Sequence, residues 1–157
     1  MTEMDFQLQF ESETVDKCPL VEPLCLSPAT TVREALQQMK QRNCAAVLIC
    51  SDRRIAGIFT ERDVLKMMAA GADFNVSIDQ VMTPNPVVLR AQDTVGTAIA
   101  AMTHGGYRRL PIVDGDGQPV GIVKVEGILH YLVEHFPTVI YNLPPEPHYT
   151  TRQREGA

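Results

Sequence analysis

The sequence repeats itself with a period of about 63 residues, so its two halves are expected to fold alike. Residues 31–39 follow the pattern Thr-Val-x-x-Ala-x-x-x-Met, and residues 94–102 repeat it 63 positions later. The similarity continues downstream, where the Gly-Ile pair that begins at Gly57 returns at Gly121. A repeat that extends over a whole unit indicates a duplicated supersecondary structure rather than one short motif.

Each half is expected to contain a helix, a strand hairpin and a second helix. Apolar residues at i, i+3, i+4 and i+7 predict the first helix; they are Val32, Ala35, Leu36 and Met39, and then Val95, Ala98, Ile99 and Met102. Paired apolar runs around a polar turn predict the hairpins, at 45–50 with 55–59 and at 110–113 with 120–125. The second helices are predicted at 63–70 and 126–134. Extended, proline-containing segments at 21–28 and 81–89 begin the two halves.

The predicted fold class is α/β (α+β), with two β-α-β-β-α repeats packed sheet to sheet in pseudo-two-fold symmetry. A unit of about 60 residues buries too little surface to be stable alone, and two packed repeats form two similar clefts between them. The expected segments are an acidic N-terminal arm at 1–18, repeat one at 19–80, repeat two at 81–136 and a proline-rich tail at 137–157. In the arm, the alternation of Phe6, Leu8 and Phe10 favours a strand.

Composition and charge argue against several classes of partner. The 157 residues include 14 basic and 19 acidic side chains, and a net charge of −5 argues against binding to a nucleic-acid backbone. The longest apolar run, residues 45–50, is far shorter than the roughly 18–20 residues of a membrane span. The acidic N-terminus lacks the pattern of a secretory signal. The four cysteines have no CxxC spacing and fit reduced thiols. We therefore expect a cytoplasmic protein without nucleic-acid or membrane partners.

Residues 57–63, Gly-Ile-Phe-Thr-Glu-Arg-Asp, lie between a predicted strand and a predicted helix. Gly57 permits close backbone approach, and Ile58 presents an apolar side chain at the strand end. Thr60 and Asp63 begin the helix, whose free N–H groups favour an anion such as phosphate. A carboxylate accepts both hydroxyls of a ribose. The competing interpretation is that Thr60 is an N-cap and Asp63 part of a capping box.

With the repeat, this motif resembles a tandem pair of CBS domains, a Bateman module, over residues 19–136. Two further stretches carry the resemblance: Val-Met-Thr-Pro at 81–84 and Arg-Leu-Pro-Ile-Val-Asp at 109–114. The resemblance implies a regulatory, non-catalytic module that binds an adenine nucleotide (AMP, ADP or ATP) between the repeats and requires no cofactor. It also implies a homodimer. Because the chain shows no effector domain, a separate effector protein is expected.

The resemblance assigns candidate ligand contacts residue by residue in the first repeat. Asp63 resembles the ribose acceptor, and Thr60 the residue near ribose and phosphate. Ile58 and Ala45 resemble the edges of the adenine pocket, beside Gly57. Thr31 matches a position that contacts base or ribose, and Cys44 opens the strand that lines the cleft.

The second repeat departs from the motif. Lys124 stands where Thr60 does, and Gly127 stands where Asp63 does, so the ribose-binding carboxylate is missing. We therefore expect one competent nucleotide site per chain, organised by repeat one. Arg108 and Arg109 resemble basic residues that contact phosphates in a neighbouring cleft, and Lys124 is a further candidate.

Other functions remain open at this stage. The pair could act without ligand as a structural dimerisation or protein-interaction module, or could sense S-adenosylmethionine, another adenosyl ligand or a cyclic dinucleotide. A third hypothesis is a small Cys-dependent enzyme, with Cys44 near the cleft as its reactive residue. No nucleophile motif or plausible triad is evident, so we expect no catalytic residues and no enzyme.

No metal site is expected from the sequence. The sequence Asp-Gly-Asp-Gly at 114–117 resembles a calcium loop but has Val125 where the bidentate glutamate is needed. The stretch is therefore interpreted as a hairpin turn. His130 and His135 lie five positions apart and match neither of the zinc-binding helix motifs HExxH and HxxEH.

Overall fold

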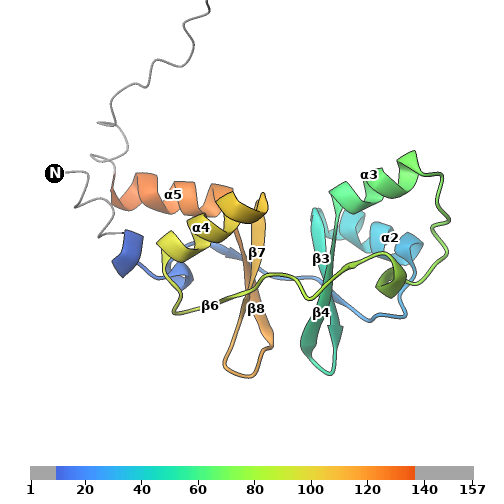
Figure 1. Cartoon of the computed structure of the whole chain (residues 1–157), viewed down its shortest axis with the longest axis horizontal. Coiled ribbons are helices and arrows are strands. Elements are labelled where there is room, and N and C mark those ends of the chain that lie inside the picture. Colours follow the sequence, from blue (N-terminus) through green and yellow to red (C-terminus); the bar gives the residue numbers. More distant parts are fainter. Residues whose placement is uncertain (1–9, 137–157) are drawn as a thin grey trace, which may run out of the picture.

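Two four-stranded sheets lie side by side at the centre of the molecule, with helices on their outer sides (Figure 1). The structure is a computed structural model and describes residues 10–136. The strand orders are β1-β8-β7-β6 and β2-β3-β4-β5. The predicted fold class, two similar α+β units packed sheet to sheet, is confirmed.

The long elements occur twice in the same order. In repeat one they are α2 (Val32–Arg42), β3 (Ala46–Ser51), β4 (Arg54–Thr60) and α3 (Glu61–Ala69). In repeat two they are α4 (Val95–Gly105), β7 (Arg109–Val113), β8 (Pro119–Lys124) and α5 (Val125–His135). The predicted hairpin strands and second helices agree with these bounds to within two residues. Within residues 10–136, no helix is both long and apolar enough to cross a membrane.

Local sequence signals explain where the first helices begin and end. The Thr31 hydroxyl accepts from the Glu34 N–H at 3.2 Å, and the Thr94 hydroxyl accepts from the Thr97 N–H at 3.1 Å. Both satisfy free donors of a first helical turn. Asn43 and Gly106 end α2 and α4 in the left-handed conformation, with φ of 49° and 67°, which closes the last turn.

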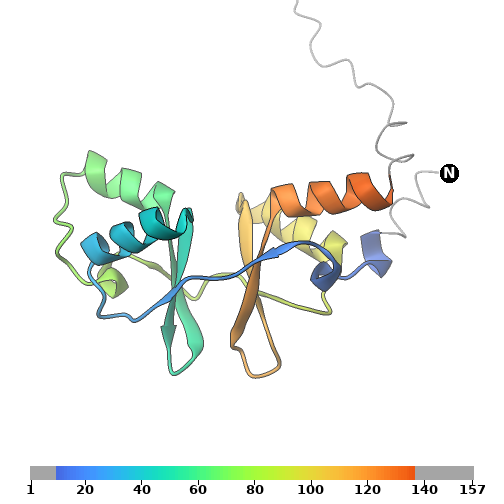
Figure 2. The same ribbon diagram turned by 180° about the vertical axis from the view of Figure 1, so that it is seen from behind.

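The short strands exchange partners between the repeats. β1 (Leu20–Val21) pairs with β8 of repeat two, whereas β2 (Cys25–Leu26) pairs with β3 of repeat one. Conversely, β5 (Thr83–Pro84) pairs with β4, and β6 (Leu89–Arg90) pairs with β7. The blue connection in Figure 2 and the yellow-green one in Figure 1 are the two crossings. Each sheet is therefore completed by a segment that the sequence places beside the other repeat.

Two short 3-10 helices precede the exchanged strands β1 and β5, and each packs on the same repeat as the strand that follows it. η1 (Val15–Lys17) packs on repeat two, where the Val15 N–H donates to the Asp93 carbonyl at 2.9 Å. η2 (Ile78–Gln80) packs on repeat one, where the Ile78 N–H donates to the Thr30 carbonyl at 2.8 Å. Val15 and Ile78 are fully buried, one in each apolar core.

The strand predicted from the alternation of Phe6, Leu8 and Phe10 is wrong at Phe10, because residues 10–12 are helical. Phe6 and Leu8 lie outside the described residues, as does the tail at 137–157. The arm is anchored further along, where the Tyr131 hydroxyl donates to the Glu13 carboxylate. This bond is the main reason that the pKa of Glu13 is lowered.

The exchange predicts that the repeats unfold together. Truncating the buried Ile78 to Ala removes an anchor of the core of repeat one and is expected to lower the free energy of unfolding by about 2–5 kcal/mol. Urea denaturation followed by far-ultraviolet circular dichroism should retain one transition.

Val120→Ala, at a half-exposed position of β8, is the matched control, with an expected change below about 0.5 kcal/mol. Two separate transitions would contradict joint unfolding of the repeats, and an effect of Ile78→Ala no larger than that of the control would show that η2 does not anchor the core of repeat one.

Candidate functional site

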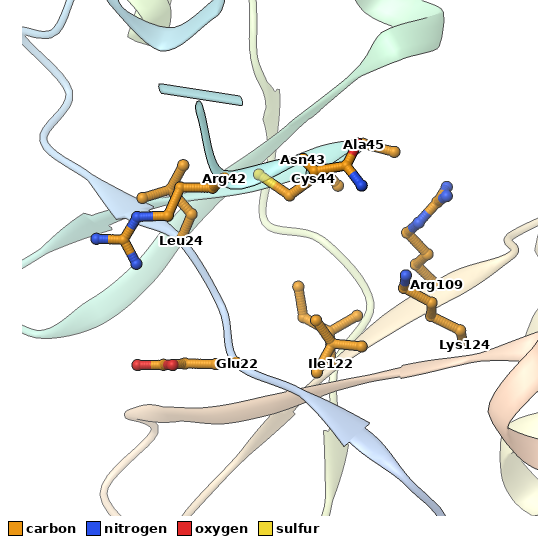
Figure 3. Close-up of a pocket in the computed structure, with 11 residues that line it drawn as sticks. Glu22, Leu24, Arg42, Asn43, Cys44, Ala45, Arg109, Ile122 and Lys124 are labelled. Atoms are coloured by element: carbon orange, nitrogen blue, oxygen red, sulfur yellow. The ribbon is translucent and has the colours of Figure 1, made fainter. Parts of the chain in front are cut away.

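A pocket of about 250 Å³ lies between the two repeats (Figure 3). Its walls are the junction of α2 and β3, the neighbouring strands β7 and β8, and the connection from β1 to β2. The lining residues are Val21, Glu22, Leu24, Arg42, Asn43, Cys44, Ala45, Ala46, Arg109, Ile122 and Lys124. The exchanged segment thus forms one wall of a cavity to which both repeats contribute.

The pocket is basic although the chain is acidic. Arg42, Arg109 and Lys124 supply three cations against the single carboxylate of Glu22. Arg109 and Lys124 are direct partners in the β7–β8 ladder. Figure 3 shows Arg109 extending toward Ala45, with Lys124 beside it. The arrangement favours an anion through charge-assisted hydrogen bonds.

Arg109 carries an unsatisfied donor. Its Nε is buried and has no hydrogen-bond partner within residues 10–136. In the same part of the chain, neither Arg109 nor Lys124 forms an ion pair. A buried donor without a partner costs about 1–3 kcal/mol, so an incoming acceptor would remove a penalty as well as form a bond.

The motif residues Thr60 and Asp63 lie at the junction of β4 and α3. The Asp63 Oδ2 accepts from the Thr60 N–H at 2.8 Å and from its hydroxyl at 3.1 Å. These bonds fix the carboxylate at the start of the helix, as the capping interpretation predicts. Within the described residues, the other oxygen, Oδ1, has no hydrogen bond. Capping and ligand binding are therefore compatible at Asp63.

The close approach that Gly57 permits is to the exchanged strand β5. A Cβ on Gly57 would meet the Met82 sulfur and lie 2.9 Å from the Thr83 carbonyl oxygen. Ile58 is half-buried and is the ladder partner of Thr83. This end of the motif is thus shaped by strand pairing.

The structure divides the predicted site residues into groups. Cys44, Ala45, Arg109 and Lys124 come together in the pocket, whereas Gly57, Ile58, Thr60 and Asp63 lie along β4 and the start of α3 and do not line it.

Two predicted residues are engaged elsewhere. Thr31 forms a reciprocal capping box with Glu34. Arg108, with its side chain 76% exposed, pairs with Glu126 at 3.8 Å.

The repeat explains this division. Ile122 and Lys124 occupy the positions in repeat two that Ile58 and Thr60 occupy in repeat one. The pocket therefore lies on the Lys124 side, whereas Thr60 and Asp63 lie at the equivalent place in repeat one.

Several pocket residues were not among the predicted contacts. The repeat itself could have identified Ile122, because it is the equivalent of Ile58. Glu22 and Arg42 carry no motif, and their place depends on the strand exchange and on the end of α2.

The cysteines differ in their surroundings. Burial raises the pKa of Cys18 to about 11 and that of Cys50 to about 12, so little reactive thiolate forms at either. Cys44 lines the pocket, but no histidine is among the described lining residues. A Cys–His pair is therefore not formed there.

Two pseudo-symmetric units with a pocket of about 250 Å³ between them define a tandem-repeat module. The chain belongs to the CBS domain family, whose model matches it twice, over residues 15–70 and 78–134. CBS-domain pairs are generally regulatory modules rather than enzymes.

Two curated relatives share most of the paired region. The chain is 33% identical over 137 residues to the meiotically up-regulated gene 70 protein of Schizosaccharomyces pombe, which covers 86% of this chain and 18% of that protein. It is 32% identical over 110 residues to an uncharacterized 17.7 kDa protein of Acidianus ambivalens, with coverages of 69% and 66%. The chain spans less than two thirds of the length of each.

Solved structures share the fold. The CBS domain pair of protein MJ0100, in complex with 5′-methylthioadenosine and S-adenosyl-L-methionine, has a TM-score of 0.69 and 22% identity, covering 77% of this chain and 96% of that one. PAE2072 from Pyrobaculum aerophilum, complexed with AMP, has a TM-score of 0.69 and 18% identity, with coverages of 82% and 96%.

The unpaired Arg109 predicts a gain in stability when its charge is removed. Arg109→Met keeps the apolar stem and removes the orphaned donor, and is expected to raise the free energy of unfolding of ligand-free protein by about 1 kcal/mol. Chemical denaturation in phosphate-free buffer measures it.

The control is Arg108→Met, which removes an exposed charge whose ion pair with Glu126 is worth between about 0 and 1 kcal/mol. A loss of stability in Arg109→Met larger than in the control would show that Arg109 stabilises the fold rather than destabilising it.

Proposed function

We propose that this chain is a regulatory module that binds an adenine nucleotide (AMP, ADP or ATP) between its CBS repeats and carries out no chemistry itself. The observation that carries the proposal is the Asp63 carboxylate, which Thr60 fixes at the start of α3 through Oδ2. Its Oδ1 has no hydrogen-bond partner among residues 10–136. An acceptor held there suits the hydroxyls of a ribose. The first turn of the same helix suits a phosphate.

In this proposal the nucleotide is contacted by residues of repeat one and by one residue of repeat two, Arg108. Asp63 accepts from the ribose, and Thr60 lies between ribose and phosphate. Ile58 contacts the base, and Arg108 reaches a phosphate after releasing its exposed, 3.8 Å pair with Glu126. Thr31 contributes after loosening its capping box with Glu34.

Structural relatives support an adenosine-containing ligand. PAE2072 and CBSX2 were each determined in complex with AMP, and the MJ0100 pair with 5′-methylthioadenosine and S-adenosyl-L-methionine. The adenosyl group is common to all three. S-adenosylmethionine is therefore the main alternative ligand.

Thermal denaturation in the presence of AMP, ADP, ATP, S-adenosylmethionine and 5′-methylthioadenosine tests the proposal. A ligand that binds only the folded chain stabilises it by about 2.7 kcal/mol at a hundredfold excess over Kd. We expect the melting temperature to rise with the concentration of an adenine nucleotide. In Asp63→Asn, the nucleotide concentration needed for the same rise should be at least tenfold higher, since a charged hydrogen-bond acceptor is lost.

Asp52→Asn is the matched control, an exposed carboxylate in the β3–β4 turn, and its response should equal that of the wild type. No response to any of the five ligands, together with no nucleotide in mass spectra of gently purified protein, would favour an interaction module without ligand.

We also propose that the module is a homodimer. Its support is exposed apolar surface on the second helices, where Leu65 and Met68 of α3 and Leu129 of α5 are 66%, 61% and 55% exposed. Both helices lie along the upper side of the molecule in Figures 1 and 2. Exposed apolar surface of this kind is a feature of protein interaction sites.

Light scattering coupled to size exclusion tests this interface. Leu65→Glu with Leu129→Glu should convert a dimer to a monomer, because two charges would be buried without partners. Val120→Glu, on an exposed strand position, should leave the mass unchanged. A monomeric wild type, or a dimer that survives the double substitution, would contradict the proposal.

A further inference from the structure

We propose that Cys25 and Cys50 form a redox-sensitive thiol pair, which hydrogen peroxide converts reversibly into a disulfide within one chain. The two cysteines lie on the neighbouring strands β2 and β3 of repeat one. Neither is among the residues that line the pocket, and neither belongs to the site proposed at Asp63. The inference therefore goes beyond the proposed ligand-binding function and does not depend on it.

The parallel pairing of β2 and β3 brings the two cysteines together. Cys25 is the ladder partner of Leu48, and Cys50 follows Leu48 by two residues. Side chains two residues apart on a strand point to the same face, so Cys25 and Cys50 share one face of the sheet. Because neighbouring strands are only about 4.8 Å apart, the two side chains are diagonal neighbours on that face.

The shared face is the one turned toward repeat two. Leu26, Val47 and Ile49 point to the other face, where they belong to the apolar core of repeat one. In Figure 1 the helices α2 and α3 lie on that core side of β3 and β4, and the strands of repeat two lie on the opposite side. Cys25 also directly follows Leu24, which lines the pocket between the repeats.

The two thiols interact and differ in their exposure. Cys25 is exposed, whereas Cys50 is half-buried. Burial, and next a side-chain hydrogen bond with Cys25, raise the pKa of Cys50 to about 12, so this thiol keeps its proton at neutral pH. An accessible cysteine beside a second thiol is the arrangement of a redox sensor with its resolving partner. Cys25 is therefore the thiol that an oxidant reaches first.

The oxidation takes two steps. The Cys25 sulfur attacks one oxygen of hydrogen peroxide, the O–O bond breaks, and the product is a sulfenic acid; the other oxygen takes the thiol proton and leaves as water. The Cys50 sulfur then attacks the Cys25 sulfur, so that an S–S bond forms and the S–O bond breaks. The departing hydroxide takes the Cys50 proton. Two thiols and one peroxide thus give a disulfide and two water molecules, and a dithiol reverses the change by exchange.

The disulfide would couple the redox state to the wall of the pocket. It needs Cβ atoms about 3.5–4.5 Å apart, closer than diagonal neighbours on adjacent strands usually lie, so β2 must shift along β3. Such a shift is feasible because β2 has two residues and is at the edge of its sheet. The connection from β1 to β2, which supplies Glu22 and Leu24 to the pocket, would move with it.

Mass spectrometry of the full chain after brief treatment with hydrogen peroxide tests the pair. In the wild type the tryptic peptides 18–33 and 43–53 carry two cysteines each, so a link between them would be ambiguous. The double variant Cys18→Ala, Cys44→Ser leaves one cysteine in each peptide. The expected product is the two peptides joined by a disulfide within a monomeric chain, and dithiothreitol should separate them again.

Thiol counting provides a second measurement if the double variant fails to fold, which circular dichroism would show. Of the four thiols of the wild type, two should be lost to peroxide. Cys18→Ala, which removes the other cysteine of the same peptide, should also lose two, whereas Cys25→Ser should keep all that remain. Failure to join the two peptides in the folded double variant, joining only between separate chains, or loss of two thiols in Cys25→Ser would each overturn the proposal.

Discussion

The exchange of short strands between the repeats is the constraint on which the rest of the structure depends. β1 completes the sheet of repeat two, and β5 completes the sheet of repeat one. The glycines that match in the sequence repeat, Gly57 and Gly121, lie against these exchanged segments: a Cβ on Gly57 would meet Thr83, and one on Gly121 would lie 3.1 Å from the Leu20 Cβ. A side chain at either glycine would displace the exchanged strand, so the pairing between the repeats requires residues without a side chain at these two positions.

The same exchange places side chains of opposite charge at opposite ends of one pocket. The segment between β1 and β2 supplies Glu22 to the pocket, while β7 and β8 supply Arg109 and Lys124. A net charge of −5 thus coexists with a basic cavity. The low-dielectric walls of a cleft focus the field of the charges that line it, so the local potential differs from that of the whole surface. The unpaired Arg109 donor destabilises the folded chain, and unfavourable features of this kind are commonly found at binding sites.

Much of the fold follows from local sequence signals. The i, i+3, i+4, i+7 pattern, with Thr31 and Thr94 as caps, predicts helices at the observed places because tertiary packing and local propensity agree there. The hairpins follow from paired apolar runs in the same way. By contrast, β1 and β5 have two residues each, and a strand that short carries no periodic pattern from which its partner sheet could be predicted.

The site was less predictable than the fold for a related reason. Arg108 and Arg109 are neighbours in the sequence, yet Arg109 lines the pocket and Arg108 is exposed beside Glu126. Successive residues at a strand point to opposite sides, so the register of β7 decides which of the two side chains lines the pocket. Glu22 and Arg42 belong to no sequence motif. They line the pocket because the β1–β2 connection and the end of α2 lie at its wall.

The exchange also dictates an order of folding during synthesis. The sheet of repeat one draws its four strands from the continuous stretch between Cys25 and Pro84, so all four strands are synthesised before most of repeat two. β1 is made earlier still, but its partners are Ile122 and Val123, about a hundred residues later. Closing so long a loop is entropically slow. The N-terminal strand can therefore pair only after β8 has been synthesised, and the pocket that it borders cannot close before then.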